Sequence, residues 1–253
     1  MQTAAKRMKR PEHLVWTPEM VKNFWDYESQ FPEQYFTYQR STEMARQISP
    51  FLAPGSRVLD YGCGPGYLIE KLMQRGFRAA GLDFSAATLS AVREKFGHTP
   101  VFLGAYTLQE LRDTGMHFDA ATVIEVVEHL YDAQLQELLQ TLKSLLKPGG
   151  VAVFSTPNEE RLEKSMILCP VSNQLFHRWQ HVRSWSADSL SACLRDNGFD
   201  IVNAFSTNFS VSFHTDHSRH PLRDKWLAVR RKIKDRFKRQ RKQPHLVVIA
   251  RAL

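Results

Sequence analysis

The stretch Val58-Leu59-Asp60-Tyr61-Gly62-Cys63-Gly64-Pro65-Gly66 decides the fold of this chain. A short apolar run followed by Gly-x-Gly-x-Gly predicts a buried strand that ends in a sharp loop before a helix. Glycines allow the backbone to bend there and let a ligand approach it closely. Asp60, at the carboxyl end of the strand, is placed to accept hydrogen bonds from the loop or from a cationic amine. The spacing is not the G-x-G-x-x-G of pyrophosphate binders.

Alternating strands and helices follow this stretch. Strands are predicted at 57–61, 77–82, 100–103, 118–124, 151–155, 200–205 and 245–250, and helices at 67–75, 85–96, 132–146 and 186–197. Strands that alternate with helices of this length favour a doubly wound α/β fold, here a Rossmann-like sheet of seven mostly parallel strands. We therefore divide the chain into N-terminal helices that form a lid (1–50), a core (51–205, with an insertion at 156–184), a basic insertion (206–244) and a final strand (245–253).

Composition limits the function classes. The 253 residues are 43% hydrophobic, which suits one α/β domain with additions. Three widely spaced cysteines argue against a disulfide framework and for a reducing compartment. No run approaches the roughly 20 apolar residues that cross a bilayer, so we expect a cytoplasmic protein. The net charge of +8 comes from segments such as 219–242, and the body of the chain is acidic.

Four motifs in order resemble those of class I S-adenosylmethionine-dependent methyltransferases. They are Val58–Gly66, Gly81-Leu82-Asp83-Phe84-Ser85, Phe118-Asp119-Ala120 and Leu146-Lys147-Pro148-Gly149-Gly150. The resemblance covers roughly residues 57–156. It implies S-adenosyl-L-methionine as the cofactor, with Gly62, Gly64 and Gly66 on its methionine part, Asp83 on the ribose and Phe84 beside the adenine. We also predict cofactor contacts for Asp60 and Ile124.

One part of the chain departs from that family pattern. Many members have an acidic residue just after the third strand, whereas Gly104-Ala105-Tyr106 occupies the region here. Adenine recognition must then depend on backbone groups or on another side chain.

The sequence Glu125-Val126-Val127-Glu128-His129 follows the fourth strand directly. The carboxyl ends of strands line the ligand crevice of open α/β sheets, so these side chains should face it. They suit a divalent metal ion, or a general base at His129 assisted by Glu128. A structural role at the end of the sheet is the third interpretation.

Together with Phe154-Ser155-Thr156-Pro157-Asn158, this segment resembles the ubiquinone-type polyprenyl O-methyltransferases. That resemblance implies a magnesium site at Glu125, Glu128 and His129. These enzymes also place an arginine on the cofactor carboxylate, and Arg40 lies near that position in the sequence. The segment also resembles small-RNA 2′-O-methyltransferases, whose fourth metal ligand is a later histidine. His177 and His181 both follow the stretch, and His181 is the predicted fourth ligand.

The basic segment 219–242 holds twelve Lys and Arg residues. Trp226, Val229, Ile233 and Phe237 recur within it at helical spacing, which predicts an amphipathic helix. Such a helix suits the anionic inner face of a membrane. Contact with nucleic acid and a solvated face packed on the domain are the alternatives.

The sequence thus predicts an O-methyltransferase for a small-molecule, glycan or lipid-linked hydroxyl. The alternatives are a metal-dependent RNA 2′-O-methyltransferase and a non-catalytic methyltransferase-like binding protein.

Overall fold

A computed structural model of the chain describes residues 10–209 and 243–253. The predicted basic helix at 219–242 lies outside the described residues, as do residues 1–9 of the expected lid. Within the described residues, no helix has the length and apolar character needed to cross a membrane.

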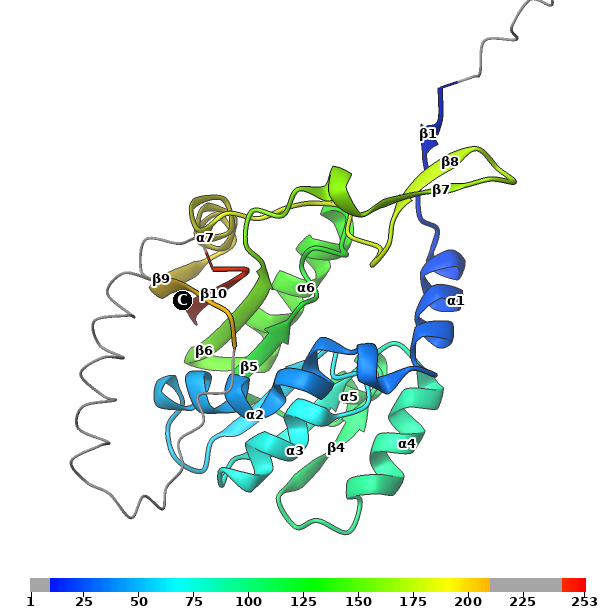
Figure 1. Cartoon of the computed structure of the whole chain (residues 1–253). Helices are drawn as coiled ribbons and strands as arrows, with labels where there is room; N and C mark the ends of the chain where they lie inside the picture. Colours follow the sequence, from blue (N-terminus) through cyan, green and yellow to red (C-terminus); the bar gives the residue numbers. More distant parts are fainter. Residues whose placement is uncertain (1–9, 210–242) are drawn as a thin grey trace, which may run out of the picture.

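The core is a seven-stranded sheet in the order β4-β3-β2-β5-β6-β10-β9 (Figure 1). Strand β10 runs antiparallel to both of its neighbours, β6 and β9, and the pairs that join β4, β3, β2, β5 and β6 are parallel. The strands are β2 (Arg57–Tyr61), β3 (Arg78–Leu82), β4 (Phe102–Tyr106), β5 (Phe118–Ile124), β6 (Leu146–Pro157), β9 (Phe199–Thr207) and β10 (His245–Ala252). The predicted seven-stranded, mostly parallel sheet is confirmed.

Helices cover both faces of the sheet and bury two hydrophobic clusters. One face carries α2 (Phe36–Ile48), α3 (Tyr67–Gln74) and α4 (Ala86–Phe96). The other face carries α5 (Leu108–Asp113), α6 (Asp132–Leu145) and α7 (Ala187–Asp196). Buried Leu, Ile and Val side chains of these helices pack against alternate strand residues, so the sheet is doubly wound as expected.

Strand β4 starts two residues later than predicted. Phe102 N–H donates to Thr99 O at 2.9 Å, so 99–102 is a turn and the strand begins only at Phe102. Gly104, Ala105 and Tyr106 consequently lie inside β4, which corrects their placement after the strand. The residue that follows the strand is Thr107, which caps the unpredicted helix α5 in a capping box with Glu110.

The predicted insertion at 156–184 has its own secondary structure. Strand β6 continues to Pro157, and a 3₁₀ turn η3 (Leu162–Ser165) leads into the hairpin of β7 (Met166–Cys169) and β8 (Gln174–His177). Strand β1 (Glu12–His13) pairs parallel to β8 and closes a three-stranded sheet at the edge of the molecule (Figure 1). These strands were not predicted, because a hairpin in an insertion breaks the alternation of strand and helix.

The N-terminal segment contains helices, as predicted. The side chain of Thr17 accepts a hydrogen bond from Met20 N–H and caps α1 (Pro18–Glu28). A 3₁₀ turn η1 (Pro32–Gln34) joins α1 to α2, and η2 (Ser49–Phe51) ends the segment.

Candidate functional site

The glycine loop leaves the carboxyl end of β2 and enters α3. Gly62, Gly64 and Gly66 all have left-handed φ values, 73°, 48° and 76°. Leu82 O, at the end of β3, accepts from Gly62 N–H at 2.8 Å and from Cys63 N–H at 3.0 Å. These two hydrogen bonds hold the loop against the neighbouring strand.

Asp83 supports the same loop. One of its oxygens accepts from Gly64 N–H at 2.9 Å and the other accepts from Ser85 N–H at 3.0 Å. The carboxylate is buried, and burial raises its pKa although these backbone donors oppose the rise. The next side chain, Phe84, is 59% exposed, which leaves its ring free to cover a ligand.

Asp60 is buried at the end of β2, where Thr122 Oγ1 donates to it at 2.7 Å. Burial raises the pKa of Asp60 to about 7, against the Thr122 hydrogen bond and with a smaller contribution from the charge of Asp83. Two buried carboxyl groups therefore flank the glycine loop, and a cationic ligand would stabilise both in their ionised form.

Tyr35 covers the loop from the N-terminal segment, a role that the sequence did not suggest. A Cβ placed on Gly64 would meet only the Tyr35 ring, at 3.5 Å. Burial, and then the charge of Asp83, raise the pKa of the Tyr35 hydroxyl. Arg40 lies on α2 and is half-buried, whereas Ile124 lies in the core cluster with 6% exposure. Their predicted cofactor contacts remain predictions.

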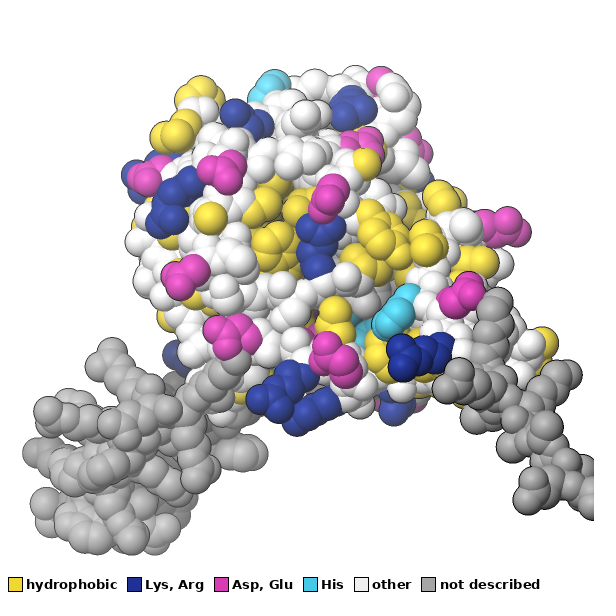
Figure 2. Space-filling view, turned by 90° about the horizontal axis from the view of Figure 1, so that it is seen from above, with side chains coloured by type: hydrophobic (Ala, Val, Ile, Leu, Met, Phe, Trp, Pro, Cys, Tyr) yellow, Lys and Arg dark blue, Asp and Glu magenta, His cyan; other side chains and the backbone are white. Residues whose placement is uncertain are grey.

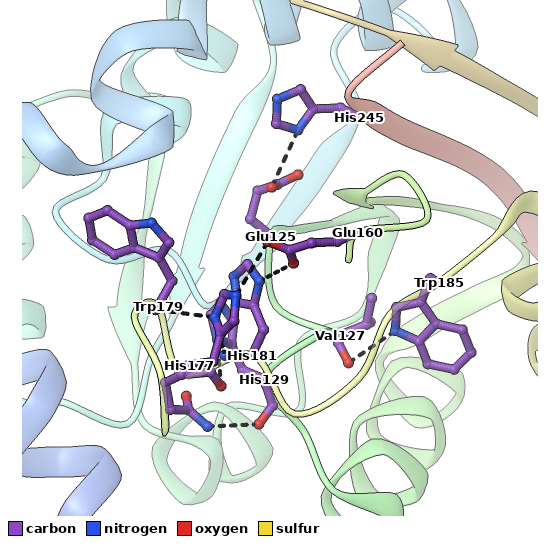
Figure 3. Close-up of polar contacts among 10 residues, drawn as sticks. Glu125, Val127, His129, Glu160, His177, Trp179, His181, Trp185 and His245 are labelled. Atoms are coloured by element: carbon purple, nitrogen blue, oxygen red, sulfur yellow. Dashed lines mark hydrogen bonds and ion pairs between the residues drawn. The ribbon is translucent and has the colours of Figure 1, made fainter. Parts of the chain in front are cut away.

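The Glu125–His129 segment turns sharply away from β5. Glu125 has φ 51°, a left-handed conformation that is uncommon outside glycine. Its carboxylate accepts from Ser155 Oγ at 2.8 Å and lies 3.4 Å from Nδ1 of His245, the first residue of β10 (Figure 3). Glu125 is thus directed toward β6 and β10.

Three of the predicted metal ligands come together. Potential ligand atoms of Glu128, His129 and His181 lie within 4.8 Å of one another, and Glu125 is not in this group. Glu128 is 1% exposed. The Thr156 hydroxyl lies beside its carboxylate as a donor that lowers its pKa, but neither carboxylate oxygen makes a well-formed hydrogen bond among the described residues. Burial, and then the charge of Glu125, raise the pKa of Glu128 well above its usual range. Burial and the neighbouring His181 lower the pKa of His129 to about 3.

The insertion is fastened to this segment. Glu128 O accepts from Val182 N–H at 2.9 Å, and Val127 O accepts from Trp185 Nε1 at 3.3 Å. Gln180 donates to His129 O at 3.0 Å and accepts from Trp25 Nε1 at 3.2 Å, which links α1 to the cluster. A contact between residues 51 or more positions apart leaves no local signal in the sequence.

Glu160 and His177 are site residues that the predicted ligand set did not include. Both lie beside His181, and Glu160, His177 and His181 form a second group of possible ligand atoms within 4.8 Å of one another. Burial alone would raise the pKa of Glu160, but its contacts with His177 and His181 lower the pKa to about 2. The sign of this second group in the sequence was the pair His177 and His181.

A glycine loop and an acidic residue at the ends of adjacent parallel strands define a nucleoside-cofactor site in a doubly wound sheet. Comparison with known proteins leads to the same class of site. Residues 36–204 match the family model described as a methyltransferase domain. A ubiquinone biosynthesis O-methyltransferase of Roseobacter denitrificans is 31% identical over 212 residues, which cover 76% of this chain and 84% of the relative.

Solved structures share the fold at low sequence identity. A glycopeptide N-methyltransferase complexed with S-adenosyl-L-methionine has a TM-score of 0.57 at 16% identity, covering 84% of this chain and 94% of its own. An S-adenosylmethionine-dependent methyltransferase from Clostridium acetobutylicum has a TM-score of 0.57 at 14% identity, covering 92% and 98%. The chain belongs to the methyltransferase family defined by that domain and is an S-adenosylmethionine-dependent methyltransferase.

The buried Asp60 gives a pH-dependent stability prediction. Its pKa is raised, so ionising it opposes folding: the penalty is absent below pH 4, grows as the pH rises toward 7 and is constant above. Asp60→Asn should therefore stabilise the apo protein at pH 8 by up to about 4 kcal/mol. This gain in stability should disappear near pH 4. The same substitution should weaken cofactor binding. Urea unfolding at both pH values and calorimetric titration of S-adenosyl-L-methionine measure the two effects. A gain that is equal at both pH values would contradict the assignment.

Gly64 and Gly55 form a matched pair. Both have positive φ, and a Cβ at Gly55 would have no heavy atom within 4 Å. Ala at either position should cost about 1–2 kcal/mol of stability for the left-handed backbone. Only Gly64→Ala should weaken S-adenosyl-L-methionine binding, by tenfold or more, because only there does the ligand approach the backbone. Equal affinities of the two variants would exclude Gly64 from the cofactor site.

Proposed function

We propose that this methyltransferase methylates a hydroxyl group of a small, lipid-linked molecule and that it binds a divalent cation at Glu128, His129 and His181. The observation that carries the proposal is the buried Glu128 carboxylate, which makes no well-formed hydrogen bond among the described residues, has the Thr156 hydroxyl beside it and faces two imidazoles. The name of the Roseobacter denitrificans relative supports oxygen as the methylated atom.

The residues fit a cation on chemical grounds. Ionising a carboxyl group that is buried without a counter-charge costs several kcal/mol, and a bound cation offsets that cost. Two imidazoles and one carboxylate are the donors that first-row transition ions prefer, whereas Mg²⁺ prefers oxygen ligands. We therefore propose an ion such as Mn²⁺, Co²⁺ or Zn²⁺ in place of the expected magnesium. When bound, such an ion lowers the pKa of a hydroxyl group that reaches it.

The residues of the chain align the methyl donor with the acceptor. Methyl transfer from a sulfonium is an in-line displacement, so donor carbon and acceptor oxygen must be held at a fixed approach. The glycine loop after β2 and the cluster after β5 leave adjacent parallel strands, with Asp60 opposite Thr122 in the pairing. Donor and acceptor sites therefore open into the same crevice, and Tyr35 and Trp25 lie over it.

The hairpin of β7 and β8 supports an acceptor with an apolar tail. Its eleven residues from Met166 to Phe176 carry no charge. Ile167, Leu168 and Val171 are 42%, 47% and 94% exposed. Figure 2 looks down on the molecule from above, and hydrophobic side chains gather on this face between charged ones. Since β8 ends at His177, the hairpin leads from an apolar surface directly to the cluster. A lipid-linked acceptor would bring this face to the inner surface of a membrane.

Removing the Glu128 charge tests the cation site. Glu128→Gln should leave the apo protein about as stable as wild type, because burial already favours the neutral carboxyl group, yet weaken Co²⁺ binding at least 100-fold. Visible absorption of Co²⁺ and thermal unfolding measure these effects, and the exposed Glu94→Gln serves as the control. Turnover that persists in a chelator, together with Co²⁺ affinity unchanged by Glu128→Gln, would refute the site.

Polar substitutions on the hairpin test the acceptor. Leu168→Ser with Val171→Ser should raise KM several-fold for a catechol carrying a polyprenyl chain and leave KM for catechol itself unchanged, because only the chain contacts the hairpin. Val202→Ser, at the 45% exposed Val202 on β9, is the matched control. An equal change in KM for both substrates would show that the hairpin does not bind the tail.

A further inference from the structure

The Glu160 carboxylate contacts two imidazoles, one with each oxygen (Figure 3). Its Oε2 is 2.5 Å from Nδ1 of His181, and its Oε1 is 3.4 Å from Nε2 of His177. The two rings stack with their centroids 4.4 Å apart and their planes at 18°. Glu160 therefore contacts a different nitrogen on each ring.

The hydrogen bonds of His177 determine its tautomer. The backbone N–H groups of Trp179 and His181 both donate to His177 Nδ1, each at 3.2 Å. A nitrogen that accepts from two donors carries no proton, so in the neutral ring the proton is on Nε2, facing Glu160. His177 is 2% exposed, so this arrangement is enclosed by the protein.

It follows that Glu160, His177 and His181 are not a second cation site. A neutral imidazole binds a metal ion through the nitrogen that lacks a proton, and in His177 that nitrogen is already occupied by backbone donors. The closeness of the three side chains has another explanation. Glu160 accepts from His181, and Nε2 of His177 faces the second oxygen of Glu160 at 3.4 Å, an electrostatic contact without hydrogen-bond geometry.

The same reasoning assigns His181 and His129. An ionised carboxylate only accepts hydrogen bonds, so His181 Nδ1–H donates to Glu160 Oε2, and the lone pair of the neutral His181 ring is on Nε2. His129 Nδ1 lies 3.4 Å from the carbonyl oxygen of Gln180, which only accepts, so His129 likewise keeps its lone pair on Nε2. Both imidazoles then have one free nitrogen for the group that contains Glu128.

We propose that Glu160 and His177 are positioning residues that hold His181 as the Nδ1-protonated tautomer, with Nε2 presented toward Glu128 and His129. The proposal rests on the proposed function in taking that nitrogen as a ligand of the cation. Carboxylates that hold metal-binding histidines in this way raise the basicity of the ligand and fix its orientation, and losing them typically weakens metal binding about 10–100-fold.

The first test needs no metal. Long-range ¹⁵N–¹H spectra of the full chain labelled at histidine report which ring nitrogen is protonated. We expect protonated Nδ1 in His181 and protonated Nε2 in His177, and we expect Glu160→Gln to shift His181 toward the other tautomer. His181 protonated at Nε2 in the wild type, or a His181 tautomer that Glu160→Gln leaves unchanged, would overturn the proposal.

The second test uses Co²⁺ as the probe. Glu160→Gln should weaken Co²⁺ binding about 10–100-fold, while S-adenosyl-L-methionine affinity and the thermal midpoint stay near wild type. Glu163→Gln, an exposed glutamate in the same insertion, is the control and should behave as wild type. His177→Gln, which can still accept the backbone N–H groups and donate to Glu160, should retain more affinity than His177→Ala. Equal Co²⁺ affinity in Glu160→Gln and wild type would overturn the positioning role.

The two tests separate this inference from the proposed function. If the wild type binds no Co²⁺ but the tautomers are as stated and respond to Glu160→Gln, the cation site fails and the positioning of His181 stands. If the wild type binds Co²⁺ and Glu160→Gln binds it equally, the cation site stands and the positioning role fails.

Discussion

The site depends on the place where the winding of the sheet reverses, between β2 and β5. From β2 the chain proceeds outward to β3 and β4, then crosses back to β5 and continues to β6 on the other side. The loops that follow β2 and β5 therefore diverge to opposite faces and leave a crevice at the carboxyl ends of the two strands. The glycine loop borders one side of it and the Glu125–His129 segment borders the other.

Three buried carboxyl groups lie near the carboxyl ends of these strands, each in a different environment. Asp83 accepts from two backbone N–H groups, Asp60 accepts from Thr122, and Glu128 makes no well-formed hydrogen bond among the described residues. Burial raises the pKa of all three. A cofactor with a positive sulfonium and ammonium group, and a cation beside Glu128, are the ligands that would offset their desolvation.

The insertion after β6 packs against the segment after β5, although the two are far apart in the sequence. Its end, from His177 to Trp185, lies along the turn after β5 and is held by backbone and side-chain hydrogen bonds to Val127, Glu128 and His129. Its beginning provides Glu160 and the apolar hairpin. The same segment thus contributes a cluster histidine, the carboxylate that contacts it and the exposed surface next to it.

The sequence by itself determined the doubly wound sheet, the glycine loop and Asp83, because strand–helix alternation and glycine spacing are local properties of the chain. It also identified Glu128, His129 and His181 as candidates. Only the tertiary structure decided that Glu125 turns to His245, that Tyr35 covers Gly64 and that Glu160 contacts His177 and His181. These contacts join segments that are far apart in the chain, and the fold of an irregular insertion is set by what it packs against, which no periodicity records.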